Sequence, residues 1–253
     1  IYKTLGENRH MAQALLDMGR ASRLMGNFEA AETCYQKALK LVEKGSDTQR
    51  LVANIRMEQA NNAWFQADYQ DAFELQNRVY KMADQHDWPL ERVMALNTSG
   101  LIWWTLGDHQ RALRELKRAL DLAETLRIRK DEKATTLNNM GLVYRDMGEF
   151  QKALEVLDAA LSIDTDLNSR WAMAYDLKNQ AMTYLMMNAP QKALPLFSRA
   201  LKMAKAIGNQ VNVAKILVGY GEALEKSGRV KEANVIYNEA LTLSEKMRLR
   251  ETV

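Results

Sequence analysis

The 253-residue sequence is poor in the residues that interrupt helices or cross-link a chain. It contains 12 glycines, 3 prolines and one cysteine, Cys34. A single cysteine excludes an internal disulfide bond, and the scarcity of glycine and proline leaves few sites at which a helix must stop. The residues that dominate instead are Ala, Leu, Glu, Lys, Gln, Arg and Met, which are good helix formers. The composition therefore predicts an all-α protein.

The sequence also lacks strong charge and long apolar runs. Its formal net charge is +3 and it has no basic block, so we expect no nucleic-acid partner, because such binding usually needs a concentrated basic stripe. No apolar run approaches the roughly 18 residues of a membrane-spanning helix, and no signal peptide is visible. We therefore expect no membrane partner and a cytoplasmic location. Because the chain begins with Ile1, we expect it to be a piece of a longer protein.

No pattern of residues in the sequence indicates catalysis. The three histidines, His10, His86 and His109, are far apart, and no pair has the spacing of metal ligands. The sequence has no glycine-rich phosphate loop and no nucleophile elbow. Glu222 and Glu225 are one helical turn apart, which is more typical of a solvated helix face than of a catalytic pair. We expect no enzymatic activity, no cofactor and no metal.

Small residues recur at one period along most of the chain. Alanines stand 40 or 41 residues apart, at Ala31, Ala72, Ala112, Ala153, Ala193 and Ala233. Five residues before them stand Gly26, Ala67, Gly107, Gly148, Asn188 and Gly228. Twelve residues before them stand Gly19, Ala60, Gly100, Gly141, Ala181 and Gly221. A repeat of this length predicts a solenoid of stacked helical hairpins, in which small residues let the helices approach closely.

The positions five residues before the alanines are expected to close the first helix of each hairpin. Glycine or asparagine can take the left-handed conformation that ends many helices. Ala67 departs from this pattern, so we expect the second hairpin to turn differently. Pro190 is expected in the first turn of a helix, and Pro195 further in, where it bends the helix. Helix N-caps are expected within residues 45–47, 85–89, 164–166 and 208–209.

The repeated segments resemble the tetratricopeptide repeat. The third hairpin reads LNTSGLIWWTLGDHQRALRELKRAL and the fourth LNNMGLVYRDMGEFQKALEVLDAAL. The period exceeds the usual length of about 34 residues and is similar to that of kinesin light chains and bacterial signalling proteins. The resemblance implies a right-handed α-solenoid of about six hairpins, forming one domain over residues 1–253. The hairpins are expected at 8–45, 48–86, 89–127, 130–167, 170–208 and 210–247, with the start of a seventh at 248–253.

The resemblance also implies that the first helices line a peptide-binding groove. Positions 8, 11 and 15 residues before the repeat alanines share one helix face. The expected groove residues are Asn61, Trp64, Phe65, Asn97, Leu101, Trp104, Asn138, Leu142, Arg145 and Lys178. Amides can pair with a peptide backbone, and tryptophans often anchor partners, whereas Trp103 is expected in the core. Arg20 and Arg23 near one end, and Glu222 and Glu225 near the other, predict a charge gradient.

Two hypotheses for function follow. The first is a protein-protein interaction scaffold that binds a protein or an extended peptide in this groove. The alternative is a regulatory or sensor module of a larger bacterial signalling protein or effector enzyme, whose own effector domain would then be a partner.

Overall fold

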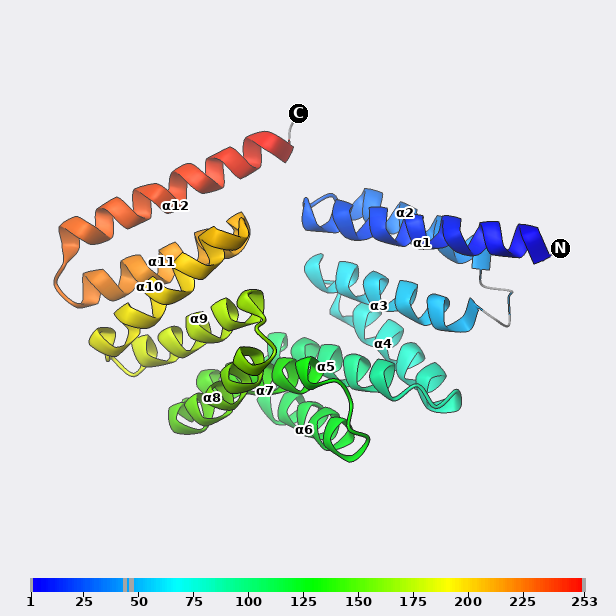
Figure 1. Cartoon of the computed structure of the whole chain (residues 1–253), viewed down its shortest axis with the longest axis horizontal. Coiled ribbons are helices and arrows are strands. Elements are labelled where there is room, and N and C mark those ends of the chain that lie inside the picture. Colours follow the sequence, from blue (N-terminus) through cyan, green and yellow to red (C-terminus); the bar gives the residue numbers. More distant parts are fainter. Residues whose placement is uncertain (1, 43–44, 46–47, 252–253) are drawn as a thin grey trace. The chain divides into compact units, whose positions relative to one another are not determined.

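The chain is helical throughout the part that the structure describes. The computed structural model describes residues 2–42, 45 and 48–251, which form twelve helices and no strand (Figure 1). The helices are α1 (Tyr2–Leu24), α2 (Phe28–Val42), α3 (Gln49–Phe65), α4 (Tyr69–Gln85), α5 (Pro89–Thr105), α6 (His109–Thr125), α7 (Lys130–Asp146), α8 (Phe150–Asp166), α9 (Arg170–Met186), α10 (Pro190–Ile207), α11 (Gln210–Lys226) and α12 (Val230–Glu251). The predicted all-α class is confirmed.

Consecutive helices pack in pairs, so each odd-numbered helix is the first helix of a hairpin and the next is its second. The chain divides into two compact units, Ile1–Ile128 with α1–α6 and Arg129–Val253 with α7–α12. Within each unit the second helix of a hairpin packs on the first helix of the next, as α4 does on α5 and α8 on α9. First helices of neighbouring hairpins also touch, including α3 with α5 and α7 with α9. This stacking confirms the predicted α-solenoid of hairpins.

The turn inside the second hairpin corrects one expectation. Ala67 has a φ of 62°, in the left-handed region that the corresponding Gly107 also occupies, with a φ of 79°. The amide of Asp68 donates to the carbonyl of Ala63 over 2.9 Å, and Asp108 repeats this bond to Trp103 over 2.9 Å. The second hairpin therefore turns like the others. The hydrogen bonds that close α3 offset a backbone strain of about 1–2 kcal/mol at Ala67.

The connections between hairpins differ in part from the prediction. Asn209 caps α11, its Oδ1 accepting from the amide of Asn212 over 3.0 Å. Residues 164–166 belong to α8 instead of a loop, and the left-handed residue that follows that helix is Asn168. Ser46 and Asp47 lie outside the described residues. Residues 248–251, where a seventh hairpin was expected to start, continue α12 because no glycine or proline follows Gly228.

Small residues in the first helices allow close packing against the second helices. A Cβ atom added at Gly100 would lie 2.6 Å from Cγ of Leu116, and one added at Gly141 would lie 2.6 Å from Cγ of Leu157. Leu116 and Leu157 are buried. Glycine at these positions is therefore required by the distance between α5 and α6, and between α7 and α8.

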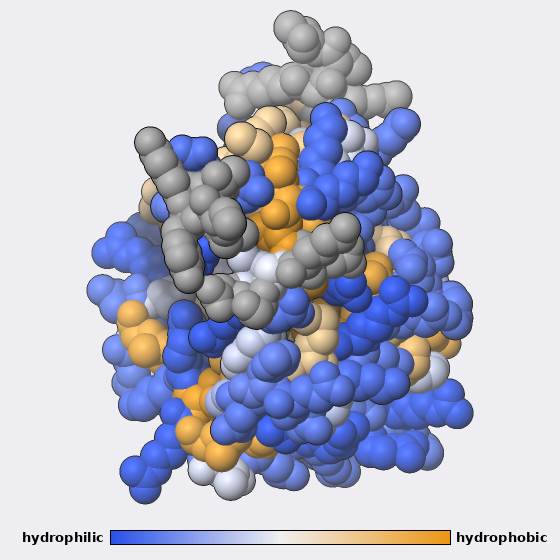
Figure 2. Space-filling model, turned by 90° about the vertical axis from the view of Figure 1, so that its right-hand side faces the viewer, coloured by the Kyte–Doolittle hydropathy of each residue, from blue (hydrophilic) through white to orange (hydrophobic). Residues whose placement is uncertain are grey.

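The two prolines of α10 occupy the expected positions. Pro190 lies in the first turn, and Pro195 lies inside the helix. None of the helices in the described part of the chain is both long and apolar enough to cross a membrane. Most of the face in Figure 2 is hydrophilic, and the hydrophobic residues on it form small separate patches.

Candidate binding surfaces on the first helices

In the first unit, the predicted groove residues of α3 form an aromatic surface. Phe65 is 52% exposed and stacks on Phe28, with ring centroids 6.2 Å apart. The half-buried Trp64 meets Phe65 edge-on, with centroids 4.8 Å apart, and its Nε1 donates to Oγ1 of Thr105 over 3.1 Å. Asn61 is half-buried on the same helix. We call Phe28, Trp64 and Phe65 the aromatic patch.

Two arginines border the aromatic patch, but an internal acid pairs with both. The guanidinium of Arg23 lies 5.4 Å from the ring centroid of Phe65. Glu58 accepts from Nε of Arg20 over 2.9 Å and from a terminal nitrogen of Arg23 over 3.0 Å. Glu58 offsets one of the two positive charges at the basic end that the sequence predicted, and Asp17 also pairs with Arg20 at 3.3 Å.

The acidic end of the predicted gradient is also internally bonded. Glu222 pairs with Lys226 at 2.9 Å, and Glu225 accepts from the hydroxyl of Tyr237 over 3.1 Å. The predicted charge gradient is therefore reduced at both of its ends.

The predicted groove residues of α5 are more covered than those of α3. Leu101 and Trp104 are half-buried, and Asn97 is only 5% exposed. Among the described residues, neither amide atom of Asn97 has a hydrogen-bond partner. Trp103 packs between helices as expected, meeting Phe73 of α4 edge-on at 5.0 Å between centroids.

In the second unit, one predicted groove residue, Asn138, lines a cavity that the sequence did not indicate. Asn138, Leu142 and Arg145 lie on α7, and Lys178 lies on α9. Between α7, the end of α8 and the start of α9 is a cavity of about 180 Å³. It is lined by Ala134, Thr135, Asn138, Asn139, Asp164, Trp171, Ala172, Tyr175 and Asp176. We call it the α7–α9 cavity.

Two buried carboxyl groups line the α7–α9 cavity. Asp176 is 1% exposed and Asp164 is 4% exposed. Burial and then the charge of Asp164 raise the pKa of Asp176, which lies at about 8 despite the opposing hydrogen bond from Asn138. Burial also raises the pKa of Asp164. The two carboxyl groups also hydrogen-bond to each other, which raises the pKa of Asp176 and lowers that of Asp164.

The amide of Asn138 joins the two first helices beside these acids. Its Nδ2 donates to Oδ1 of Asp176, and its Oδ1 accepts from Nδ2 of Asn179 over 2.8 Å. Asn138 was predicted to bind the backbone of a peptide. In this structure its carbonyl and one amide hydrogen are bonded to side chains of α9.

Aromatic and basic side chains stand beside the same cavity. Trp171 is 52% exposed and lies 4.8 Å from Tyr175 between ring centroids. Nζ of Lys178 lies 4.6 Å from the centroid of Tyr175. Burial, together with the positive charges of Lys215 and Arg145, lowers the pKa of Lys178 to about 8. The side chain of Arg145 is 13% exposed and bonds to Asp146 at 2.9 Å.

Four residues that line the α7–α9 cavity, Trp171, Tyr175, Asp164 and Asp176, were not predicted from the sequence. Trp171 and Tyr175 precede the predicted Lys178 at helical steps of four and three, so extending the predicted face toward the start of α9 would have included both. Asp164 and Asp176 gave no such signal, because their proximity depends on how α8 and α9 meet. Among the described residues, no group of three or more His, Cys, Asp and Glu side chains could hold a metal ion.

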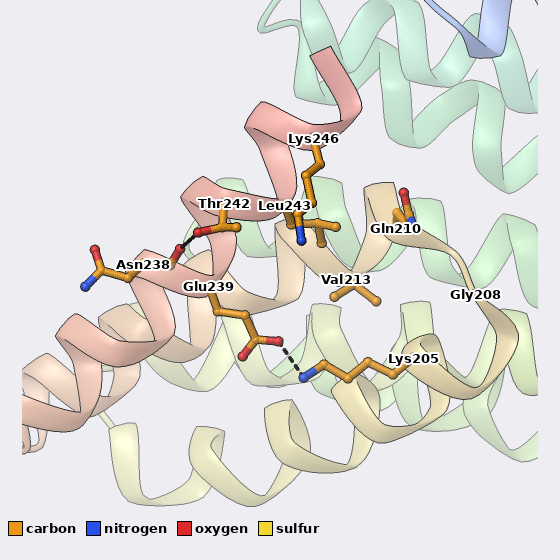
Figure 3. A pocket seen from close by; sticks show the side chains of 9 residues that line it. All are labelled: Lys205, Gly208, Gln210, Val213, Asn238, Glu239, Thr242, Leu243 and Lys246. Carbon is orange, nitrogen blue, oxygen red and sulfur yellow. Dashed lines mark hydrogen bonds and ion pairs between the residues drawn. The ribbon is translucent and has the colours of Figure 1, made fainter. Parts of the chain in front are cut away.

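A larger groove in the second unit is a consequence of hairpin stacking. It has a volume of about 580 Å³, and Val213 and Leu243 supply apolar walls between α11 and α12 (Figure 3). The ammonium of Lys205 bonds to Glu239 at 2.6 Å along one side. A groove of about 460 Å³ occurs at corresponding repeat positions among α4, α5 and α6. Because such a groove recurs between hairpins, and Lys205 and Glu239 pair with each other, we do not regard the groove at α11 and α12 as a dedicated binding site.

Several solved structures have the same fold. The Rap conjugation gene regulator of plasmid pLS20, in complex with the Phr* peptide, has a TM-score of 0.72 and 15% identity, over 92% of this chain and 73% of that one. A Podosopora anserina putative kinesin light chain has a TM-score of 0.61 and 16% identity, over 80% and 98%. A signal transduction ATPase with a tetratricopeptide repeat sensor, from Pyrococcus horikoshii, has a TM-score of 0.65 and 15% identity, over 97% and 38%.

These structural matches show a shared fold, and the repeat organisation supports a protein-interaction scaffold. A comparison with curated proteins gave no match. The family model described as tetratricopeptide repeat matches residues 10–85, 91–166 and 171–246. Because these residues make up most of the sequence, the chain belongs to the tetratricopeptide repeat family.

Proposed function

We propose that the chain binds an extended peptide, or an extended segment of a protein, on the first helices of its hairpins. The observation that carries this proposal is the exposure of aromatic rings on those helices. Phe65 at the end of α3 and Trp171 at the start of α9 are each 52% exposed. Exposed aromatic side chains beside polar groups are typical of binding surfaces, because they bury a large apolar area on contact.

The two aromatic surfaces would act as separate anchor points. In the first unit, the aromatic patch offers stacked rings bordered by Arg23. In the second unit, Trp171 and Tyr175 stand beside a cavity large enough for one side chain. A partner that fills either site gains most of its affinity from a few buried groups. The peptide bound by the similar Rap regulator supports a peptide ligand here.

Peptide selection on the whole chain tests the proposal. A displayed library of random 12-residue peptides would be selected on the chain, and the affinity of each recovered peptide measured by fluorescence anisotropy. We expect Phe65→Ala or Trp171→Ala to weaken binding at least tenfold. Val235→Ala is the matched control, because Val235 is 67% exposed on the second helix α12. Selection of no peptide, or equal losses in the control, would contradict the proposal.

A second candidate function is that of a sensor module within a larger protein. The likeness to a signal transduction ATPase favours it, because the chain spans only 38% of that protein, which carries a tetratricopeptide repeat sensor. In this case the first helices would bind a signal peptide or an effector domain of the same polypeptide. If the gene encoding this chain encodes no further domain, this candidate is excluded while peptide binding stands.

A further inference from the structure

An apolar contact recurs where the second helix of one hairpin meets the first helix of the next. Leu201 and Ala204 of α10 belong to the same core cluster as Val213 and Ile216 of α11, and all four are buried. The residues at the equivalent positions of α2 and α3 also share one core cluster, and they are Leu39, Val42, Val52 and Ile55. Stacking thus joins two defined surfaces, one on a second helix and one on a first helix.

Helix α12 carries the second-helix surface of this contact without a cover. Leu241 and Ser244 stand forty residues after Leu201 and Ala204, at the same repeat positions. Leu241 is 57% exposed, whereas Leu201 is 9% exposed. Ser244 is exposed, whereas Ala204 is buried. Among the residues that the structure describes, α12 is the last helix. We call Leu241 and Ser244 the tail face.

Helix α1 carries the matching first-helix surface, which is also uncovered. Met11 and Ala14 stand 41 residues before Val52 and Ile55. Met11 is 55% exposed, whereas Val52 is 2% exposed. Ala14 is exposed, whereas Ile55 is buried. Met18 is exposed one turn further along the same helix face. We call Met11, Ala14 and Met18 the head face.

The head face and the tail face are the two halves of one stacking contact. A terminal repeat usually has a polar outer surface, which keeps a solenoid soluble, whereas exposed apolar groups mark surfaces that bind. Methionine side chains are flexible, so those of the head face can adapt to the residues that they meet. Each face therefore suits the other in a way that neither suits itself.

We propose that the chain associates head to tail, with the tail face of one copy packed on the head face of another. The contact between hairpins then continues from one copy into the next. A contact between two different faces leaves one face free on each end of a pair, so association proceeds to a closed ring or an open chain. This association does not depend on peptide binding, because Phe65 and Trp171 lie outside both faces.

Sedimentation velocity and light scattering on the whole chain test the proposal. Because association follows mass action, we expect the average mass to rise with protein concentration up to about 1 mM and to pass that of two copies. Leu241→Glu and Met11→Glu should each weaken association at least tenfold, because each places an unpaired charge in the contact. Circular dichroism should show that both variants keep their helices, since both side chains are exposed.

Each helix offers a matched control. Val235→Glu on α12 and Leu24→Glu on α1 also replace exposed apolar side chains. The equivalent residues of other hairpins, Pro195 and Phe65, are exposed too, so these positions lie outside the stacking contact. Both controls should associate like the unmodified chain.

A mixture of the two disrupted variants identifies the faces. Leu241→Glu keeps an intact head face and Met11→Glu keeps an intact tail face, so the mixture should form pairs and grow no further. An unmodified chain that remains a single copy at about 1 mM would overturn the proposal. A mixture without pairs, or one disrupted variant that associates like the unmodified chain, would overturn it as well, the latter in favour of a contact between two identical faces.

Discussion

The amide of Asn138 on α7 donates a hydrogen bond to the carboxyl of Asp176 on α9. The two side chains belong to neighbouring hairpins, and Asp176 is 1% exposed. This contact links two first helices and holds the carboxyl of Asp176 beside that of Asp164, to which it also hydrogen-bonds. A repeat position predicted to bind a partner thus also organises a buried acidic site.

The first prediction concerns Asp176 and stability. Its pKa is about 8 in the folded chain and 3.8 ordinarily. Between these values the unfolded chain loses a proton that the folded chain retains, so the free energy of unfolding falls as pH rises from 4 to 8. Asp176→Asn should therefore be more stable than the unmodified chain at pH 8, by about 2–4 kcal/mol.

Urea unfolding at pH 4, 6 and 8 measures this difference. The advantage of Asp176→Asn should shrink toward pH 4, where the carboxyl is largely protonated in both states. Asp166→Asn serves as the exposed control and should show no comparable trend. A difference that stays constant across this pH range would mean that Asp176 is ionised in the folded chain.

The second prediction concerns Lys178, whose pKa is lowered from 10.5 to about 8. Below pH 8 the folded chain carries a positive charge that burial and neighbouring cations disfavour. Between pH 8 and 10.5 the unfolded chain binds more protons, so the free energy of unfolding rises with pH. Lys178→Met should stabilise the chain by about 1–3 kcal/mol at pH 7 and progressively less toward pH 10.5.

Unfolding measurements at pH 7, 9 and 10.5 test this trend. Lys202→Met on α10 is the control, because Lys202 is exposed. If both lysine variants respond alike to pH, the environment of Lys178 has no special effect on its proton.

The third prediction concerns the close approach at Gly100. An alanine Cβ there would lie 2.6 Å from Cγ of Leu116 and 3.4 Å from the carbonyl oxygen of Ala112. Gly100→Ala should therefore lower the free energy of unfolding by about 1–3 kcal/mol, although alanine is otherwise the better helix former. Combining it with Leu116→Ala should give a smaller loss than the sum of the single losses, because the clash disappears. Full additivity would contradict this account.

The fourth prediction concerns the strained turn at Ala67. Its φ of 62° is costly for a residue with a Cβ atom, so Ala67→Gly should stabilise the chain by about 1 kcal/mol in thermal or urea unfolding. Gly107 occupies the same place in the next hairpin with a φ of 79°. Gly107→Ala should be destabilising by a similar amount. Two changes of the same sign would show that backbone strain does not govern this turn.

The fifth prediction separates binding from packing among three tryptophans of the first unit. Trp64→Ala combined with Trp104→Ala should weaken binding of a selected peptide that occupies the first unit, while helicity measured by circular dichroism is retained. Trp103→Ala should instead lower stability, since Trp103 packs on Phe73 and lies under Arg111, whose guanidinium is 4.7 Å from its ring centroid. Unchanged affinity in the double variant would remove this face from the binding surface.

The sequence by itself determined the helices, the hairpins and the family. The repeat alanines and the glycines before them act within one hairpin, where spacing along the chain decides which residues meet. Turn positions such as Gly107 could therefore be predicted, and Ala67 was misjudged because the hydrogen bonds of the turn outweigh the preference of the residue.

Only the tertiary structure decided which side chains meet between hairpins. Asp164 and Asp176 come together because α8 ends where α9 begins to pack on α7, and both acids then lose contact with water. Asn97 was expected at the same kind of position as Asn138. It is 5% exposed and its amide has no hydrogen-bond partner in the part of the chain that the structure describes, whereas Asn138 bonds to α9. Equivalent repeat positions differ because burial and partners are set by contacts with other helices, which the period alone does not encode.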